Sequence, residues 1–116
     1  MEYYLPDNSK IDRNDFILLR GGYCEGCGST EELTIHHVLI EDKLKHGKKI
    51  KELQYVMNLM VLCNHCHIDL RLYKGYEERV KYWWIQCKRY GHDKMVEWIK
   101  LVPLLTREKY ELLEEA

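Results

Sequence analysis

The stretches CEGC, at residues 24–27, and CNHC, at residues 63–66, decide how this chain folds. Each places two thiols on one tight turn, and two such turns supply the four sulfur ligands of a tetrahedral zinc ion. The alternative, two disulfides, is disfavoured because no export signal is visible and reducing compartments keep thiols free. The spacing therefore predicts a structural zinc site, whose ligands are Cys24, Cys27, Cys63 and Cys66.

A zinc ion with four thiolates has no open position for water or substrate, so we expect this site to be structural. It would join the segment before His36 to the segment after Leu62, and the free energy of metal binding would then stabilise the fold. Any chemistry must come from the polar side chains that the zinc site holds together. The nearby candidates are His36, His37, Asn58 and His67.

This set of residues resembles the His-Asn-His (HNH) endonucleases, which have a ββα-metal core, in the version that carries a zinc knuckle. The resemblance covers residues 24–71, and it depends on the His pair, Asn58 and His67 being interleaved with both Cys pairs. It implies a ββα-metal core within residues 20–73. It also implies a metal-dependent DNA endonuclease that hydrolyses phosphodiester bonds.

The same resemblance assigns a role to each polar residue. In the family the first position of the His pair is a metal ligand and the second is the general base, which implies these roles for His36 and His37. Asn58 matches the position that orients the base or contacts the metal, and His67 matches the ligand on the core helix. Neighbouring residues of a strand point to opposite faces, so His36 and His37 need a kink, a bulge or a strand end to serve one site.

One position departs from the family pattern. Many members carry a second His four residues after the helix ligand, whereas this chain has Arg71, which cannot bind a metal and could contact the scissile phosphate. A cation held by His36 and His67 then needs Asn58, water or substrate oxygens as further ligands. Such a site favours Mg²⁺ or Mn²⁺, which keep bound water, although imidazoles also accept Ni²⁺ or Zn²⁺.

These residues also have structural interpretations. One histidine of the pair could be buried and the other exposed, Asn58 could be a turn residue, and His67 could replace a cysteine at the zinc. The chain would then be a non-catalytic, zinc-stapled module that binds nucleic acid or protein. A third hypothesis is a zinc adaptor whose C-terminal helices form its contact surface. The joint pattern favours the nuclease.

Length and pattern predict a single α+β domain over residues 1–116, with a short helix before the core and helices after it. The expected elements are a loosely packed or extended segment over 1–11, a short helix from Asp12 or Asn14 to Gly21, strands over 33–39 and 57–62, a core helix over 64–73, and helices over 76–90, 93–102 and 107–115. The short helix is expected to place Phe16, Ile17, Leu18 and Leu19 in the core.

An apolar stripe at helical spacing lies in the last third of the chain, and it comprises Tyr76, Val80, Trp83, Trp84 and Cys87. Core packing is the favoured interpretation, and the alternative is that its aromatic rings stack on unpaired bases. Cys87 is expected to be a small buried apolar residue and not a metal ligand. The remaining histidines, at positions 46, 65 and 92, are expected at the surface.

The net charge is −1 and the sequence pI is about 6.6, so the total charge does not indicate a general affinity for nucleic acid. Residues 43–51 hold five lysines and no acid, and this stretch is either a solvated loop or a phosphate-binding loop. The lysines named as candidate DNA contacts are Lys43, Lys45, Lys48 and Lys49. DNA is the expected partner.

The sequence lacks an apolar run of 18 residues, so no membrane span is expected. We expect an intracellular, cytoplasmic protein, encoded by a host, a phage or another mobile element. A monomer would most simply nick one strand, whereas cutting both strands needs two active sites, as in a homodimer, or two visits.

Overall fold

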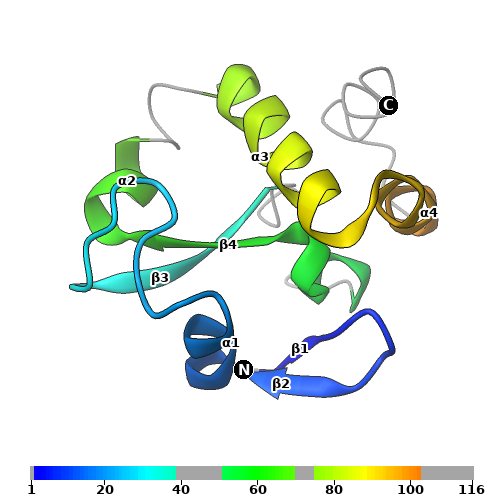
Figure 1. The fold of residues 1–116 in the computed structure, drawn as a ribbon, viewed down its shortest axis with the longest axis horizontal. Coiled ribbons are helices and arrows are strands. Elements are labelled where there is room, and N and C mark those ends of the chain that lie inside the picture. The colour runs from blue at the N-terminus through cyan, green and yellow to red at the C-terminus, as the bar shows by residue number, and fades with distance from the viewer. Residues whose placement is uncertain (1, 39–50, 70–74, 103–116) are drawn as a thin grey trace, which may run out of the picture.

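The computed structural model describes residues 2–38, 51–69 and 75–102 of the 116-residue chain, and the side chains of residues 69 and 75–79 are outside the description. This part of the chain is mixed α+β, with two small antiparallel sheets (Figure 1). Its elements are β1 (Glu2–Tyr4), β2 (Lys10–Asp12), α1 (Arg13–Leu19), β3 (Leu33–His37), β4 (Leu59–Cys63), α2 (Asn64–Asp69), α3 (Gly75–Tyr90) and α4 (His92–Leu101).

Residues 2–12 form the hairpin β1–β2, in which Tyr3 pairs with Ile11. The extended conformation expected here is confirmed, but the segment is packed and not loose. Tyr3 is buried, and its ring lies 6.2 Å from the ring of Phe16, measured between centroids. The hairpin is therefore part of the core and lies beside α1.

The short helix α1 begins and ends where the sequence indicates. The Asp12 carboxylate accepts a hydrogen bond from the backbone N–H of Asp15 at 2.8 Å, which satisfies one of the N–H groups left over at a helix start. Beyond the last turn, Gly21 has φ +106°, a conformation that glycine adopts without strain.

Only half of the apolar run on α1 reaches the core, which corrects the prediction. Phe16 and Ile17 are buried, whereas Leu18 and Leu19 are 71% and 60% exposed. Consecutive residues of a helix point about 100° apart, so four in a row cannot all face one neighbour. This short helix packs through one side only.

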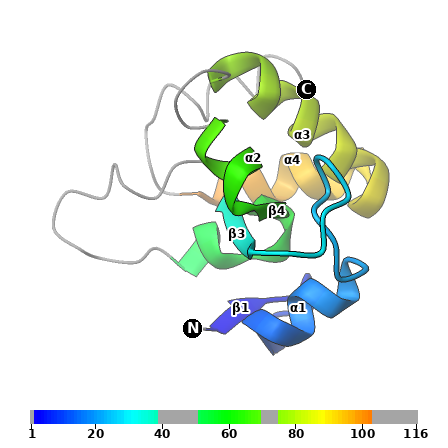
Figure 2. The same cartoon turned by 90° about the vertical axis from the view of Figure 1, so that its left-hand side faces the viewer.

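The central feature is the hairpin β3–β4, followed at once by α2. Leu33 pairs with Cys63 and His37 pairs with Leu59, and every residue of β4 is buried. A 3-10 turn, Val56–Asn58, occupies the start of the segment predicted as the second strand. Both strands contact α2, so the hairpin and this helix pack against each other (Figure 2).

The helices α3 and α4 cover the other side of this hairpin from α1 and β1–β2 (Figures 1 and 2). Trp83 of α3 and Trp98 of α4 are buried, but Trp84 is 44% exposed, so the predicted stripe is only partly a core face. Cys87 is buried as expected, and burial raises the pKa of its thiol to about 11. Gly91, with φ +97°, separates the two helices.

The predicted helix over 107–115 lies outside the described residues. Within the described ranges, no helix combines the length and the apolar character needed to cross a membrane.

Candidate metal centre and histidine pair

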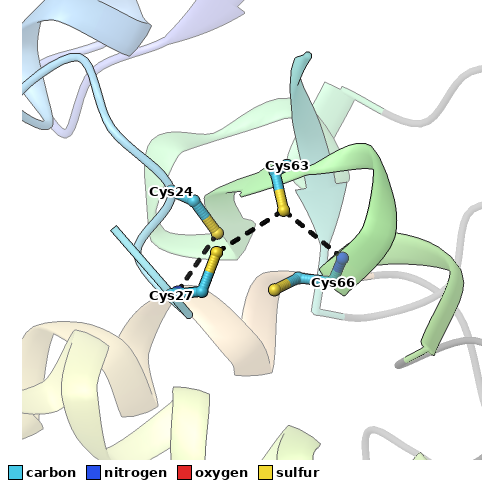
Figure 3. A group of neighbouring side chains, drawn as sticks. All are labelled: Cys24, Cys27, Cys63 and Cys66. Atoms are coloured by element: carbon cyan, nitrogen blue, oxygen red, sulfur yellow. Dashed lines mark hydrogen bonds between the residues drawn. The ribbon is translucent and has the colours of Figure 1, made fainter. Parts of the chain in front are cut away.

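Four cysteines meet where the loop after α1 approaches the junction of β4 and α2 (Figure 3). The four Sγ atoms all lie within 4.8 Å of one another, and those of Cys27 and Cys63 are 3.6 Å apart. A tetrahedral zinc with Zn–S bonds of about 2.3 Å requires sulfurs roughly 3.8 Å apart. The thiols of Cys24, Cys27, Cys63 and Cys66 therefore fit a structural metal such as zinc.

Backbone N–H groups point at two of these sulfurs. Gly26 and Cys27 donate to the Sγ of Cys24 at 3.3 and 3.4 Å, and Cys66 donates to the Sγ of Cys63 at 3.5 Å. Burial raises the pKa of Cys24, but backbone hydrogen bonds outweigh it and lower that pKa to about 6. The turn thus stabilises the thiolate of Cys24, the form that binds a metal, whereas burial and the neighbouring thiols raise the pKa of Cys66.

A second polar group lies between β3 and α2. The rings of His36 and His67 have centroids 5.1 Å apart and meet edge to face. Thr34, on the same face of β3 as His36, places its Oγ1 3.0 Å from Nδ1 of His67. His36 is only 6% exposed, and the ring of Tyr82 from α3 lies 6.2 Å away.

The hydroxyl of Thr34 fixes the tautomer of neutral His67. Thr34 donates its single hydrogen to the carbonyl oxygen of Leu62 at 2.8 Å, so its Oγ1 can only accept from Nδ1–H of His67. The lone pair of His67 then lies on Nε2, the nitrogen that could bind a metal. Because His67 directly follows Cys66, the four-cysteine cluster also determines where this ring sits.

The structure places His37 apart from this pair. His36 pairs with Met60 and His37 pairs with Leu59 in continuous register, so the two imidazoles leave opposite faces of β3. The pairing continues past the end of β3, because the backbone N–H of Val38 donates to the carbonyl oxygen of Asn58, in the turn before β4, at 2.8 Å. Nε2 of His37 lies 3.2 Å from Oε1 of Gln54. An amide oxygen only accepts, so the ring must donate from Nε2.

Asn58 is fully buried at the end of the turn before β4. Its Nδ2 donates to the carbonyl oxygen of Leu53 at 2.9 Å, and its backbone N–H donates to Tyr55 at 2.8 Å. Leu53 adjoins Gln54, the partner of His37. The Asn58 side chain therefore holds the turn that presents Gln54 to His37.

Sequence reasoning missed a buried ion pair behind the zinc loop. Arg20 donates to the Glu25 carboxylate at 3.1 Å and to the carbonyl oxygen of Leu59 at 2.8 Å. Its Nη2 donates to the carbonyl oxygen of Val56 at 2.9 Å and to the hydroxyl of Tyr90 at 2.8 Å. The side chains of Arg20 and Glu25 are only 3% and 7% exposed.

Glu25 connects the same loop to β4 and α3. Its carboxylate accepts from the backbone N–H of Val61 and from Nη2 of Arg89, each at 2.6 Å. Next to Arg89, the fully buried Gln86 donates to the carbonyl oxygens of Val56, Met57 and Leu59. Glu25 is the first x of its C-x-x-C unit, a position at which the motif requires no particular residue. Its role in the ion pair could therefore not be predicted from the motif.

The remaining candidate DNA contacts fall outside the described residues, and these are Lys43, Lys45, Lys48, Lys49 and Arg71. Comparison of the chain with protein-family models, with curated proteins and with solved structures finds no match.

Proposed function

We propose that this chain is a metal-dependent DNA endonuclease that hydrolyses phosphodiester bonds. The observation that carries the proposal is the meeting of His36 and His67, which come from β3 and α2 and whose rings lie 5.1 Å apart. A threonine orients one of them, and the four-cysteine cluster holds the start of its helix. This resembles the family arrangement in which two separate elements grip one cation.

In this proposal His36 and His67 are ligands of a divalent cation, with Mg²⁺ or Mn²⁺ favoured and Ni²⁺ or Zn²⁺ as alternatives. Bound to a phosphate, such an ion would stabilise the charge that develops and neutralise the leaving oxygen. Neutral His67 offers its Nε2 lone pair, because Nδ1–H is donated to Thr34. Water or substrate oxygens would complete the coordination.

His37 is proposed as the general base. With its Nε2–H donated to Gln54, neutral His37 carries its lone pair on Nδ1, which can accept a proton from water. Asn58 acts through the turn that holds Gln54 and is in this sense a positioning residue. Since His37 and His36 leave opposite faces of β3, the reacting water would lie beyond the strand's last residue.

The substrate in this proposal is DNA, contacted also by Arg71 and by the lysines of residues 43–51. The setting is intracellular, in a host, a phage or another mobile element. Nicked product from supercoiled plasmid indicates one active site per encounter, and linear product indicates two sites, as in a homodimer.

The test is cleavage of supercoiled plasmid by zinc-loaded protein with Mg²⁺, Mn²⁺ or Ni²⁺. Replacing the base His37 by alanine should lower the rate by at least ~100-fold, the usual contribution of one acid–base group. Replacing the ligand His36 or His67 should lower the rate through loss of the cation. His65→Ala is the matched control, because His65 is an exposed histidine of the same helix α2 and has no role in the proposal. If wild type and His37→Ala are equally inert while folded and zinc-loaded, the proposal fails.

One observation favours a second candidate, a non-catalytic zinc-stapled module that binds nucleic acid or protein. His37 is paired with Gln54 on the face of β3 away from His67. If that pairing is purely structural, the folded, zinc-loaded wild type does not cleave plasmid, and His37→Ala only lowers stability. A second divalent ion bound at His36 and His67 argues against this candidate.

A further inference from the structure

The outer side of α3 carries a line of exposed side chains that packing does not explain. Lys81, Trp84 and Lys88 are all exposed and follow one another at spacings of three and four residues, so they share one face of the helix. His92, at the start of α4, continues the line. We call these four residues the α3 outer strip. Lys81 and Lys88 are about 10 Å apart along the helix axis.

The aromatic members of the strip are already arranged as a stack. The rings of Trp84 and His92 are nearly parallel, with an interplanar angle of 10° and centroids 5.9 Å apart. Trp84 is 44% exposed, whereas its neighbour Trp83 is 1% exposed and fills the core. Trp84 therefore contributes little to core packing. Its ring is accessible to solvent and is stacked on the ring of His92.

The charge of the strip comes from its two lysines, because its other ionisable member, His92, lies 3.8 Å from the carboxylate of Asp93. Within the described residues, neither Lys81 nor Lys88 has a carboxylate within ion-pairing distance. The neighbouring cation Arg89 turns away instead, toward Glu25 and Gln86. Val80 to Tyr90 contains no acidic residue, although the overall charge of the chain is −1.

We propose that the α3 outer strip binds an unpaired nucleic-acid strand, with a base stacked on Trp84 and the flanking phosphates on Lys81 and Lys88. Every base has a flat π-face, but in a duplex both faces are covered by neighbouring pairs, so an exposed tryptophan selects a single strand. One lysine on each side of the ring matches the alternation of base and phosphate along a nucleic-acid strand. A protein partner would have no equal need for this alternation.

This inference goes beyond the proposed nuclease activity and does not require it. Tyr82, near His36, faces the hairpin, whereas the strip lies on the opposite side of α3. The strip would hold a strand segment other than the one at the histidine pair. Binding can be measured with zinc-loaded protein and no added divalent ion, so failure of cleavage and failure of this site give separate results.

The experiment measures binding of a fluorescent oligothymidylate to the zinc-loaded chain by anisotropy, together with its tryptophan emission. Trp84→Ala should bind roughly 5- to 150-fold more weakly, the range for loss of one base stack. Trp84→Phe should keep most of the affinity, because a ring remains, and Trp84→Leu should not. The oligonucleotide should quench emission in wild type but not in Trp84→Phe, since Trp83 and Trp98 are buried.

The contribution of the two lysines to binding is tested by the salt dependence of the affinity. In Lys81→Gln/Lys88→Gln, the slope of log K against log salt should fall by about 1.4, or 0.7 for each lost phosphate contact. Lys10→Gln removes an exposed lysine of β2, outside the strip, and should leave the slope unchanged. Equal affinity of wild type, Trp84→Ala and Trp84→Leu for the oligonucleotide would overturn the proposal. So would preference for duplex over single strand that depends on Trp84, or binding of a protein segment in place of the strand.

Discussion

Two groups of residues connect the loop at residues 24–27 to β4. They differ in their chemistry and in whether the sequence alone predicts them. The four-cysteine cluster brings the loop to the end of β4 and can hold a structural metal such as zinc. On the other side of the loop, the Arg20–Glu25 pair joins it to Leu59 and Val61 through charged hydrogen bonds. One group was evident from spacing alone, and the other was not. The same loop is thus held by two different groups, a cysteine cluster that can hold a metal and a buried ion pair.

Removing the metal site should have the largest effect. Cys63→Ser, or chelation of the zinc-loaded wild type, should abolish cooperative folding, because structural zinc contributes about 10–16 kcal/mol, as much as the whole stability of a small domain. Metal affinity should also fall as pH falls, since the thiols must lose their protons. Thermal melting followed by circular dichroism checks both points, with Cys87→Ser as the control cysteine. Unchanged melting after chelation would show that the cluster is not a stapling site.

Breaking the ion pair should come second. Glu25→Gln leaves the Arg20 guanidinium buried without its carboxylate, and should cost about 3–5 kcal/mol while zinc still binds. The matched control is Glu2→Gln, which removes the exposed pair with Lys10 and should cost less than about 1 kcal/mol. Urea unfolding of the zinc-loaded proteins measures the difference. Equal losses in the two variants would mean that the buried pair adds little to placing the loop.

A third substitution separates orientation from stability. Thr34→Val keeps the shape but removes the oxygen that accepts from His67, so it should cost only about 1 kcal/mol. Affinity for the second cation should fall by about 10–100-fold, as for other residues that orient a ligand. Calorimetric titration of Mn²⁺ into zinc-loaded protein makes the comparison, and Thr34→Ser should restore affinity. A variant that loses stability but not Mn²⁺ affinity would refute the orienting role.

The smallest effect is expected where the sequence prediction was wrong. Leu18→Gln and Leu19→Gln should each change the free energy of unfolding by no more than ~0.5 kcal/mol, since both side chains are exposed. Phe16→Ala, on the buried side of the same helix, should cost about 3–5 kcal/mol. Urea denaturation distinguishes them. A large loss for either leucine would mean that another surface covers this side of α1.

The parts of the fold that could be predicted are those that depend on short patterns of neighbouring residues in the sequence. The cysteine spacing placed the metal cluster, and the β-branched run and glycines located β3 and the ends of α1 and α3. Patterns of this kind depend on neighbours in the chain, and the structure confirms them. The meeting of His36 and His67 followed only from the family resemblance, because nothing in the spacing of two distant residues places one ring against the other.

What could not be predicted depends on rotation and on long-range contacts. The sequence could not show whether a bulge would turn His37 to the side of His36, and the continuous register places it on the other side. It could not tell which of Trp83 and Trp84 faces the core, since a rotation of the helix by about 100° exchanges them. Arg20 and Glu25 meet β4 through tertiary contacts that no local pattern encodes.

We propose that the cysteine cluster brings His36 and His67 together to hold a second cation. The most direct measurement is electron paramagnetic resonance of Mn²⁺ titrated into zinc-loaded protein, with His36→Ala and His67→Ala beside the wild type. The account predicts one bound Mn²⁺ per wild-type chain, with binding lost in both variants and kept in His65→Ala. Mn²⁺ that stays free in the wild type, or that binds all four proteins equally, would contradict it.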